Sequence, residues 1–244
     1  MRAQPSDSSD NLLMSTHAPL KGISSMATRQ LLAELCAEFT RHRGIEVSIE
    51  SVGGVDAAKR VQAGEVFDLV FLAADALGKL IASGHLLPGS VVDLVHSGVA
   101  VAVPAGAARP DLSSQAAVKQ AILQAPSVSY STGPSGVALL KMFEAWGILP
   151  AVQDRLLQAP AGVPVGALVA QGKAALGFQQ LSELIHVQGI TIVGPLPDEI
   201  QINTTFSGGI GAHSTQAQAA QALLTFLSSA DADDAKLRQG MTPV

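Results

Sequence analysis

Residues 67–73 read Phe67-Asp68-Leu69-Val70-Phe71-Leu72-Ala73, an apolar run that contains one carboxylate. A short run of this kind, without polar alternation, predicts a strand that is buried on both faces, as in the centre of a parallel sheet. Helical patterns flank it, from Ala57 toward Gly64 before the run and over 76–83 after it. Strands and helices that alternate through short connections indicate a doubly wound α/β fold, in which ligands bind at the carboxyl ends of the strands.

The same alternation continues on both sides of this run. An earlier helix is predicted after Thr28 and ends at Gly44, and a strand with one wet face follows over 45–49. Downstream, apolar and turn patterns predict strands at 99–104, 127–131, 174–178, 190–193 and 204–210, and helices at 114–123, 137–146, 165–171 and 216–228. Residues 230–244 are polar and are expected to form a loosely held tail.

The restart of the pattern after Pro104 indicates two lobes joined by two crossings, near 97–103 and 201–209. The first lobe is then discontinuous, formed by 19–98 plus 204–244, and the second lobe comprises 99–203. Residues 1–18 are expected to be disordered. The predicted fold is therefore a two-lobed α/β protein with two doubly wound sheets.

Composition excludes several classes of protein. The net charge is -5, and the sequence has no basic stripe that could neutralise phosphates, which argues against a nucleic-acid-binding protein. The single cysteine, Cys36, rules out an internal disulfide framework and a cysteine-ligated metal site. The six histidines are scattered without metal-ligand spacing, and no cofactor is expected. No stretch approaches the ~20 apolar residues of a membrane span.

The N-terminal 20 residues are polar and lack the basic and apolar regions of an export signal. The chain as given is therefore expected in the cytoplasm. A signal removed beforehand would change this expectation.

Four strand-to-helix turns consist of small and hydroxylated residues: Ser24-Ser25, Gly53-Gly54, the run from Ser131 to Gly136, and Gly162-Val163-Pro164. The first turn of a helix offers unpaired N–H groups and a partial positive charge. Four such turns in one cleft would bind an anion without Lys or Arg. Each turn alone is also explained by ordinary N-capping.

Single side chains add candidates, each with an alternative. Arg29 could reach a carboxylate of a ligand or lie solvated. Gln179 and Gln180 could donate to carboxylate oxygens or stabilise a loop. Asp68 is expected to satisfy backbone groups rather than act as a base. The predicted ligand-binding residues are Ser24, Ser25, Thr28, Arg29, Gly53, Gly54, Val55, Ser131, Thr132, Ser135, Gly136, Pro164, Gln179 and Gln180.

Taken together, these motifs resemble the molybdate-binding-protein-like branch of the class II periplasmic binding proteins. The resemblance spans Gly22 to about Leu227. It is carried by Ser24-Ser25 before a long helix, by Ala63-Gly64-Glu65 followed by the strand that starts at Phe67, by Pro134-Ser135-Gly136 and by Gly177-Phe178. It implies a periplasmic location, a monomer, a small anionic ligand and, if the chain is exported, an ABC permease as partner.

Two departures affect the ligand that the resemblance implies. Molybdate binders of this branch carry Ser-Ser-Gly where this chain has Gly53-Gly54-Val55, and a Tyr near the position of Gln180. The segment from Gly177 to Leu184 is more similar to the subgroup that includes aconitate isomerase. The resemblance thus implies an organic polycarboxylate rather than molybdate. Two hypotheses remain open: a binding protein for this anion, or an isomerase of an unsaturated polycarboxylate that works by a 1,3-proton shift.

Overall fold

Strand β3 (Leu69–Ala73) lies inside the sheet with all five residues buried. It pairs in parallel with β1 (Leu20–Ser25) and antiparallel with β9 (Asn203–Ile210). The predicted central, buried strand is confirmed, although only one of its neighbours is parallel. The structure, a computed structural model, describes residues 18–244, so the segment expected to be disordered lies almost wholly outside the described residues.

The main strand order is β2-β1-β3-β9-β4-β7-β5-β6, and β8 and β10 both pair with β4. Strands β1, β2 and β3 run in parallel, as do β5, β6 and β7. The strands not yet given bounds are β2 (Val47–Val52), β4 (Val92–Pro104), β5 (Val128–Tyr130), β6 (Leu156–Gln158), β7 (Leu176–Gln180), β8 (Ile190–Pro195) and β10 (Thr242–Pro243).

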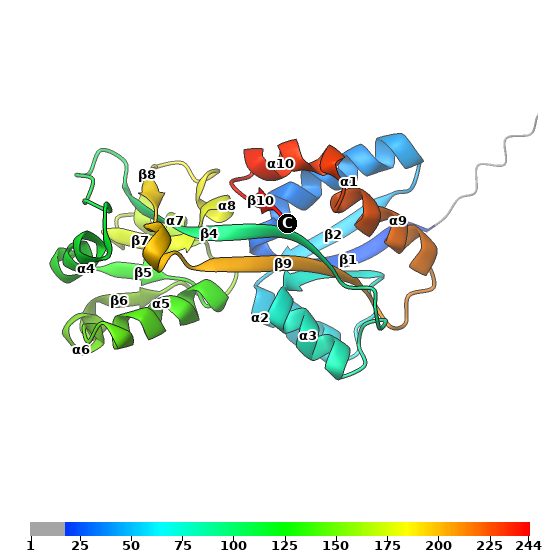
Figure 1. The fold of residues 1–244 in the computed structure, drawn as a ribbon, viewed down its shortest axis with the longest axis horizontal. Coiled ribbons are helices and arrows are strands. Elements are labelled where there is room, and N and C mark those ends of the chain that lie inside the picture. The colour runs from blue at the N-terminus through cyan, green and yellow to red at the C-terminus, as the bar shows by residue number, and fades with distance from the viewer. Residues whose placement is uncertain (1–17) are drawn as a thin grey trace, which may run out of the picture.

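Strand β4 connects two halves of the molecule (Figure 1). Its residues 92–98 pair with β9, and residues 99–104 pair with β7 and β8. Strand β9 runs beside it but pairs only with β3 and β4. The fold is the predicted two-lobed α/β architecture. The residue boundaries of the lobes remain a prediction.

Helices cover both faces of the sheet in the first half (Figure 1). On one face α1 (Arg29–Arg43), α9 (Ala217–Leu227) and α10 (Asp233–Arg238) bury apolar side chains against the strands. On the other face α2 (Gly54–Gln62) and α3 (Ala74–Ala82) do the same. These two layers explain why β3 is apolar at every position.

The second half repeats this layering. Helices α4 (Gln115–Gln124), α5 (Pro134–Ala145) and α6 (Leu149–Val152) share one core cluster with the strands. Helices α7 (Val165–Ala170) and α8 (Leu181–Leu184) contribute to clusters on the other side. The 3₁₀ helices are η1 (Met26–Thr28), η2 (Gln153–Arg155), η3 (Asp198–Ile200) and η4 (Ala230–Ala232).

The described helices are short, and the longest of them, α1, has 15 residues. Within 18–244 no single helix combines the length and the apolar character needed to cross a membrane. Helix α5 and residues 149–155 reach that length and composition only as a pair, and the pair is bent by 115°.

Asp68 has the structural role that was expected for it. Its Oδ2 atom accepts a hydrogen bond from the backbone N–H of Lys21 at 2.9 Å, and its Oδ1 atom accepts one from the hydroxyl of Ser214 at 2.6 Å. The carboxylate therefore ties the start of β1 to the segment before α9.

The prediction of a loosely held tail at 230–244 is wrong. This segment forms η4, α10 and β10, and β10 pairs with β4 next to His96. Ala232, Ala235 and Met241 are buried in the core with α1 and α9. The segment is polar in composition, and its amphipathic helix α10 is too short for its periodicity to be recognised in the sequence.

Met241→Ala is expected to lower the free energy of unfolding by about 2–4 kcal/mol, because it removes a fully buried side chain from the core. Leu237→Ala, on the exposed side of α10, is the matched control and should change stability by no more than about 0.5 kcal/mol. Urea unfolding measures both. Equal, small effects would show that the C-terminal segment is not part of the core.

Candidate functional site

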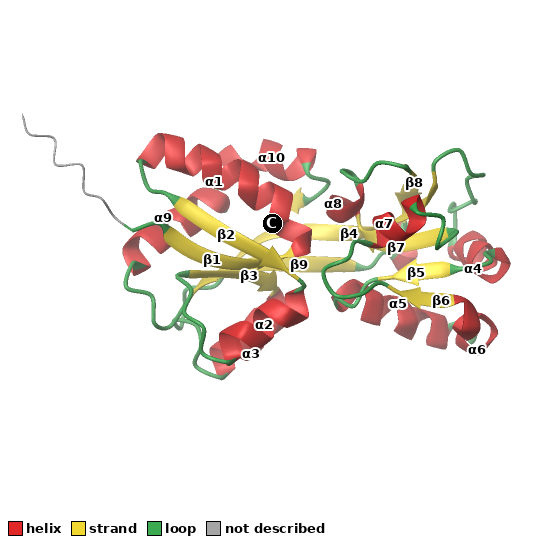
Figure 2. Ribbon diagram, turned by 180° about the vertical axis from the view of Figure 1, so that it is seen from behind, coloured by secondary structure: helices red, strands yellow, loops and turns green. Residues whose placement is uncertain are grey.

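Residues from both halves line one small cavity in the middle of the molecule, which we call the cleft. Most of them lie at or soon after the carboxyl ends of β1 and β2 in the first half and of β5, β6 and β7 in the second, and Phe206 belongs to β9. The arrowhead of β2 points toward the other half (Figure 2). The cavity volume is about 70 Å³. Its lining comprises Ser25, Met26, Ala27, Gly53, Gly54, Ser131, Thr132, Gly133, Pro134, Ser135, Pro160, Gly162, Val163, Pro164, Gln179, Gln180, Glu183 and Phe206.

The two walls of the cleft stand close together. A Cβ atom added at Gly53 would lie 3.7 Å from the backbone nitrogen of Gly162, which belongs to the opposite half. All four turns that were predicted to surround an anion contribute to this lining. The structure thus brings the four turns together in a narrow space.

Two helix N-termini without side-chain caps border the cleft. Helix α2 follows the N-cap residue Gly53, and α5 follows Gly133; neither glycine has a side chain that could accept from the first turn. The first N–H groups of both helices therefore keep their capacity to bind an anion. Because Pro134 lacks an N–H, Ser135 is the first residue of α5 that can donate from its backbone.

Gln179 does not offer its amide to the cleft. Its Oε1 atom accepts a hydrogen bond from the N–H of Val165 at 2.8 Å and so caps the start of α7. Its Nε2 atom donates to the Oε2 atom of Glu183 at 2.7 Å. The backbone N–H can bond only to an oxygen, so this arrangement fixes the orientation of the amide and directs its NH₂ group to Glu183.

Gln180 and Ser25 keep unused polar atoms in the lining. Gln180 bonds to the hydroxyl of Thr204 at 2.9 Å, while its Oε1 atom is buried without a partner in the described residues. The Oγ atom of Ser25 is likewise buried without a partner there. An amide can rotate by 180° with little change of shape, so Gln180 can present either its oxygen or its NH₂ group. Both atoms are therefore able to bond to a ligand that enters the cleft.

Among the described residues of the lining, Glu183 alone has an ionisable side chain. It is half-buried at the start of α8. Burial raises the pKa of its carboxyl group to about 7, and the hydrogen bond from Gln179 opposes this increase. A carboxyl group with this pKa exchanges a proton readily near neutral pH.

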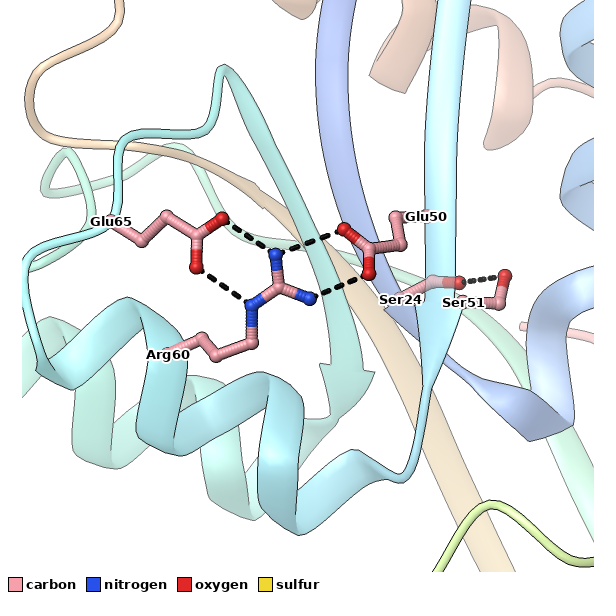
Figure 3. A network of polar contacts seen from close by, with 5 residues as sticks. All are labelled: Ser24, Glu50, Ser51, Arg60 and Glu65. Carbon is pink, nitrogen blue, oxygen red and sulfur yellow. Dashed lines mark hydrogen bonds and ion pairs between the residues drawn. The ribbon is translucent and has the colours of Figure 1, made fainter.

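Several predicted ligand-binding residues lie outside the lining. Ser24 is fully buried and bonds to Ser51 through its hydroxyl at 2.7 Å (Figure 3). Thr28 donates to the carbonyl oxygen of Ser25. Val55 is exposed. None of these three contacts the cleft.

Arg29 also lies elsewhere. It lines a separate groove of about 600 Å³ between α1 and β2, with Cys36 and Thr40. Although this groove is larger, none of the four strand-to-helix turns contributes to its lining. The cleft, where these turns meet, is therefore the better candidate for the functional site.

Gly136 has a packing role beside the cleft. A Cβ atom at this position would overlap the carbonyl oxygen of Ser131. The hydroxyls of Ser131 and Ser135 lie 3.2 Å apart in the same turn. The absence of a side chain at Gly136 therefore allows α5 to start directly against the end of β5.

Sequence reasoning missed Met26, Ala27, Pro160, Glu183 and Phe206. The apolar members carry no chemical pattern that would single them out. Glu183 had one available sign, because it is the only acidic residue between Asp154 and Asp198. The described residues contain no cluster of three His, Cys, Asp or Glu side chains that could hold a metal ion.

Gly136→Ala is expected to destabilise the protein, although alanine favours helices, because the added methyl group meets backbone rather than a flexible side chain. Gly78→Ala in α3 is the matched control, since nothing lies within 4 Å of its added Cβ atom. The control should raise the free energy of unfolding by about 0.5–1 kcal/mol. Urea unfolding would contradict this packing role if both variants gained stability.

Comparison with known proteins gives the chain a family. Residues 20–242 match the family of bacterial extracellular solute-binding proteins. The chain is 40% identical over 232 residues to an aconitate isomerase of a Pseudomonas species, which covers 91% of this chain and 87% of the relative.

Solved structures agree on the fold. The periplasmic molybdate-binding protein of Azotobacter vinelandii superposes with a TM-score of 0.77 at 21% identity, over 92% of this chain and 99% of that one. The PBP AgtB of A. tumefaciens R10 in complex with agropinic acid gives 0.71 at 13% identity, over 93% and 84% of the two chains. The family match over residues 20–242 and the relative of 40% identity show that the chain is a member of the bacterial extracellular solute-binding protein family.

Proposed function

We propose that this protein binds an unsaturated tricarboxylate of the aconitate type in the cleft and interconverts its cis and trans forms. The observation that carries the proposal is the convergence of uncharged donor groups from both halves on one cavity. The 40% identity with an aconitate isomerase narrows the class of anion. The departures from the molybdate pattern at Gly53-Gly54-Val55 and Gln180 support the same choice.

The donor groups suit a molecule with several carboxylates, for which the cavity of about 70 Å³ must widen. The N-termini of α2 and α5 lie on opposite walls, so each can receive a different carboxylate. The hydroxyl of Ser25 and the amide of Gln180 also line the cleft, as buried groups without complete hydrogen bonding among the described residues. Binding a polyanion there would satisfy both groups, and the low dielectric of the cavity would strengthen each contact.

Isomerisation by a 1,3-proton shift needs no electron transfer. A C–H bond of the substrate's CH₂ group breaks, the double bond moves by one position, and a new C–H bond forms at the former vinyl carbon. Negative charge spreads onto an adjacent carboxylate while the proton is absent. Preorganised N–H and hydroxyl donors around that carboxylate stabilise this charge.

A binding protein that delivers a small anion to an ABC permease is the second candidate. Membership of the solute-binding family supports it. Both candidates use the same cleft and the same donors. They differ in whether the bound anion changes chemically.

Proton NMR of trans-aconitate incubated with the protein distinguishes these candidates. The vinyl signal of the cis form is expected to appear and grow to an equilibrium ratio. In parallel, a thermal-shift series with trans-aconitate and molybdate reports binding, since ligand at ~100 times its Kd adds roughly 2.7 kcal/mol of stability. Stabilisation by trans-aconitate with an unchanged spectrum would identify a binding protein. Stabilisation by molybdate alone would exclude the isomerase and identify a binding protein for an inorganic oxyanion.

Ser25→Ala should weaken binding of trans-aconitate about tenfold, equivalent to about 1.4 kcal/mol, because a buried donor to the anion is lost. Stability without ligand should stay equal or increase, since the hydroxyl has no partner to lose. Ser97→Ala is the matched control: its Oγ atom is also buried and unpartnered among residues 18–244, but it does not line the cleft. Isothermal titration calorimetry and urea unfolding test the pair, and equal affinities would remove Ser25 from the site.

A further inference from the structure

We propose that Glu183 is the catalytic acid–base residue of the cleft and that Gln179 positions its carboxyl group. This inference rests on the proposed isomerisation and adds the group that moves the proton. It follows from the position of Glu183 in the lining, the hydrogen bonds that orient it and the absence of any other ionisable side chain in the described lining.

The carboxyl group of Glu183 is held by a chain of hydrogen bonds that begins in the backbone. The N–H of Val165 donates to Gln179 Oε1, and Gln179 Nε2 donates to Glu183 Oε2. The other carboxyl oxygen, Oε1, accepts no hydrogen bond from the described residues. One oxygen is thus anchored, and the other remains available to a substrate proton.

The surroundings of Glu183 are nearly free of charge. Helix α8 packs against β4, β7, η1 and α7. Strand β4 carries Asp93 and His96, which bond to Ser207 and Thr205. The C-terminal segment that reaches Leu181 at Gly240 carries Lys236 and Arg238, which pair with Asp233 and Glu34, and His186 after α8 bonds to Gln239. Burial therefore acts on Glu183 without a nearby cation to offset it, and its pKa rises to about 7.

The proton moves only between the substrate and the Glu183 side chain. The Glu183 carboxylate takes a proton from the substrate CH₂ group, and the C–H electron pair forms the new double bond. The former double bond opens at the vinyl carbon, which takes the proton back from the carboxylic acid. Glu183 ends ionised as it began, and no oxidant, reductant or co-reactant takes part.

Three variants test this assignment with trans-aconitate as substrate. Glu183→Gln keeps the shape of the side chain but cannot accept the proton, so turnover should fall by 10² to 10⁴-fold. Glu144→Gln, at an exposed position on α5, is the matched control and should keep the wild-type rate. Propane-1,2,3-tricarboxylate, a saturated analogue that lacks the double bond, reports by calorimetry whether Glu183→Gln still binds.

The pH profile separates a catalytic role from a structural one. The ionised carboxylate is the active base, so kcat/KM of the wild type should rise as pH increases through about 7. Glu183→Gln should lose this rise. Gln179→Leu removes a hydrogen bond that lowers the pKa of Glu183, so the rise should move to higher pH.

Stability against pH gives a readout that needs no activity. Glu183 keeps its proton to a higher pH in the folded protein than in the unfolded chain, where the ordinary value is 4.5. The folded state therefore loses stability as pH rises from 4.5 to about 7, and Glu183→Gln removes that loss. The melting temperature of Glu183→Gln relative to wild type should be higher at pH 8 than at pH 5, while Glu144→Gln shows no such difference.

The outcomes distinguish the two proposals. Wild-type turnover that Glu183→Gln retains would overturn the assignment of Glu183 and leave the proposed function standing. A wild type that binds trans-aconitate but never converts it would overturn both. Lost turnover together with intact binding of the saturated analogue and a flattened pH profile would support both.

Discussion

The function of this molecule depends on one geometric constraint: the parallel strands of its two halves end facing each other. Helices α2 and α5, which follow such strands, begin at that edge with first-turn N–H groups that no side chain caps. Because β4 and β9 hold the halves together, those helix starts meet in a single narrow space. A positive potential can then arise from backbone dipoles alone, which explains how the described lining can favour an anion without Lys or Arg.

The sequence predicted the turns better than the side chains within them. Glycine, proline and serine at the strand ends mark where helices begin, and these marks are local. Successive residues of a strand point to opposite faces, and here Ser25 lines the cleft while Ser24 bonds to Ser51. Which one does so depends on how β1 pairs with β2, and that register is not visible in the sequence. Gln179 and Gln180 show the same ambiguity, since one caps α7 and the other faces Thr204.

The C-terminal segment, which its polar composition led us to expect as a loose tail, packs against the helix that carries Glu183. Gln239 bonds to His186 in the second half and to Glu34 on α1 in the first. Gly240 has a φ of 70°, and a Cβ atom there would lie 2.8 Å from Leu181, the first residue of α8. The last residues of the chain thus support the short helix that carries Glu183. A four-residue helix has little stability of its own, so this external packing matters for the position of the carboxyl group.

A carboxyl group in a cavity that binds a polyanion repels the ligand when the side chain is ionised. A pKa near 7 reduces this repulsion at neutral pH. At neutral pH the group is partly protonated, so the cost of placing a polyanion beside it is lower than beside a fully ionised carboxylate. The same value is also suited to proton transfer in both directions, since an acid–base residue must take a proton and release it within one turnover. If the apolar packing around α8 sets this pKa, the residues that stabilise the short helix also tune its chemistry.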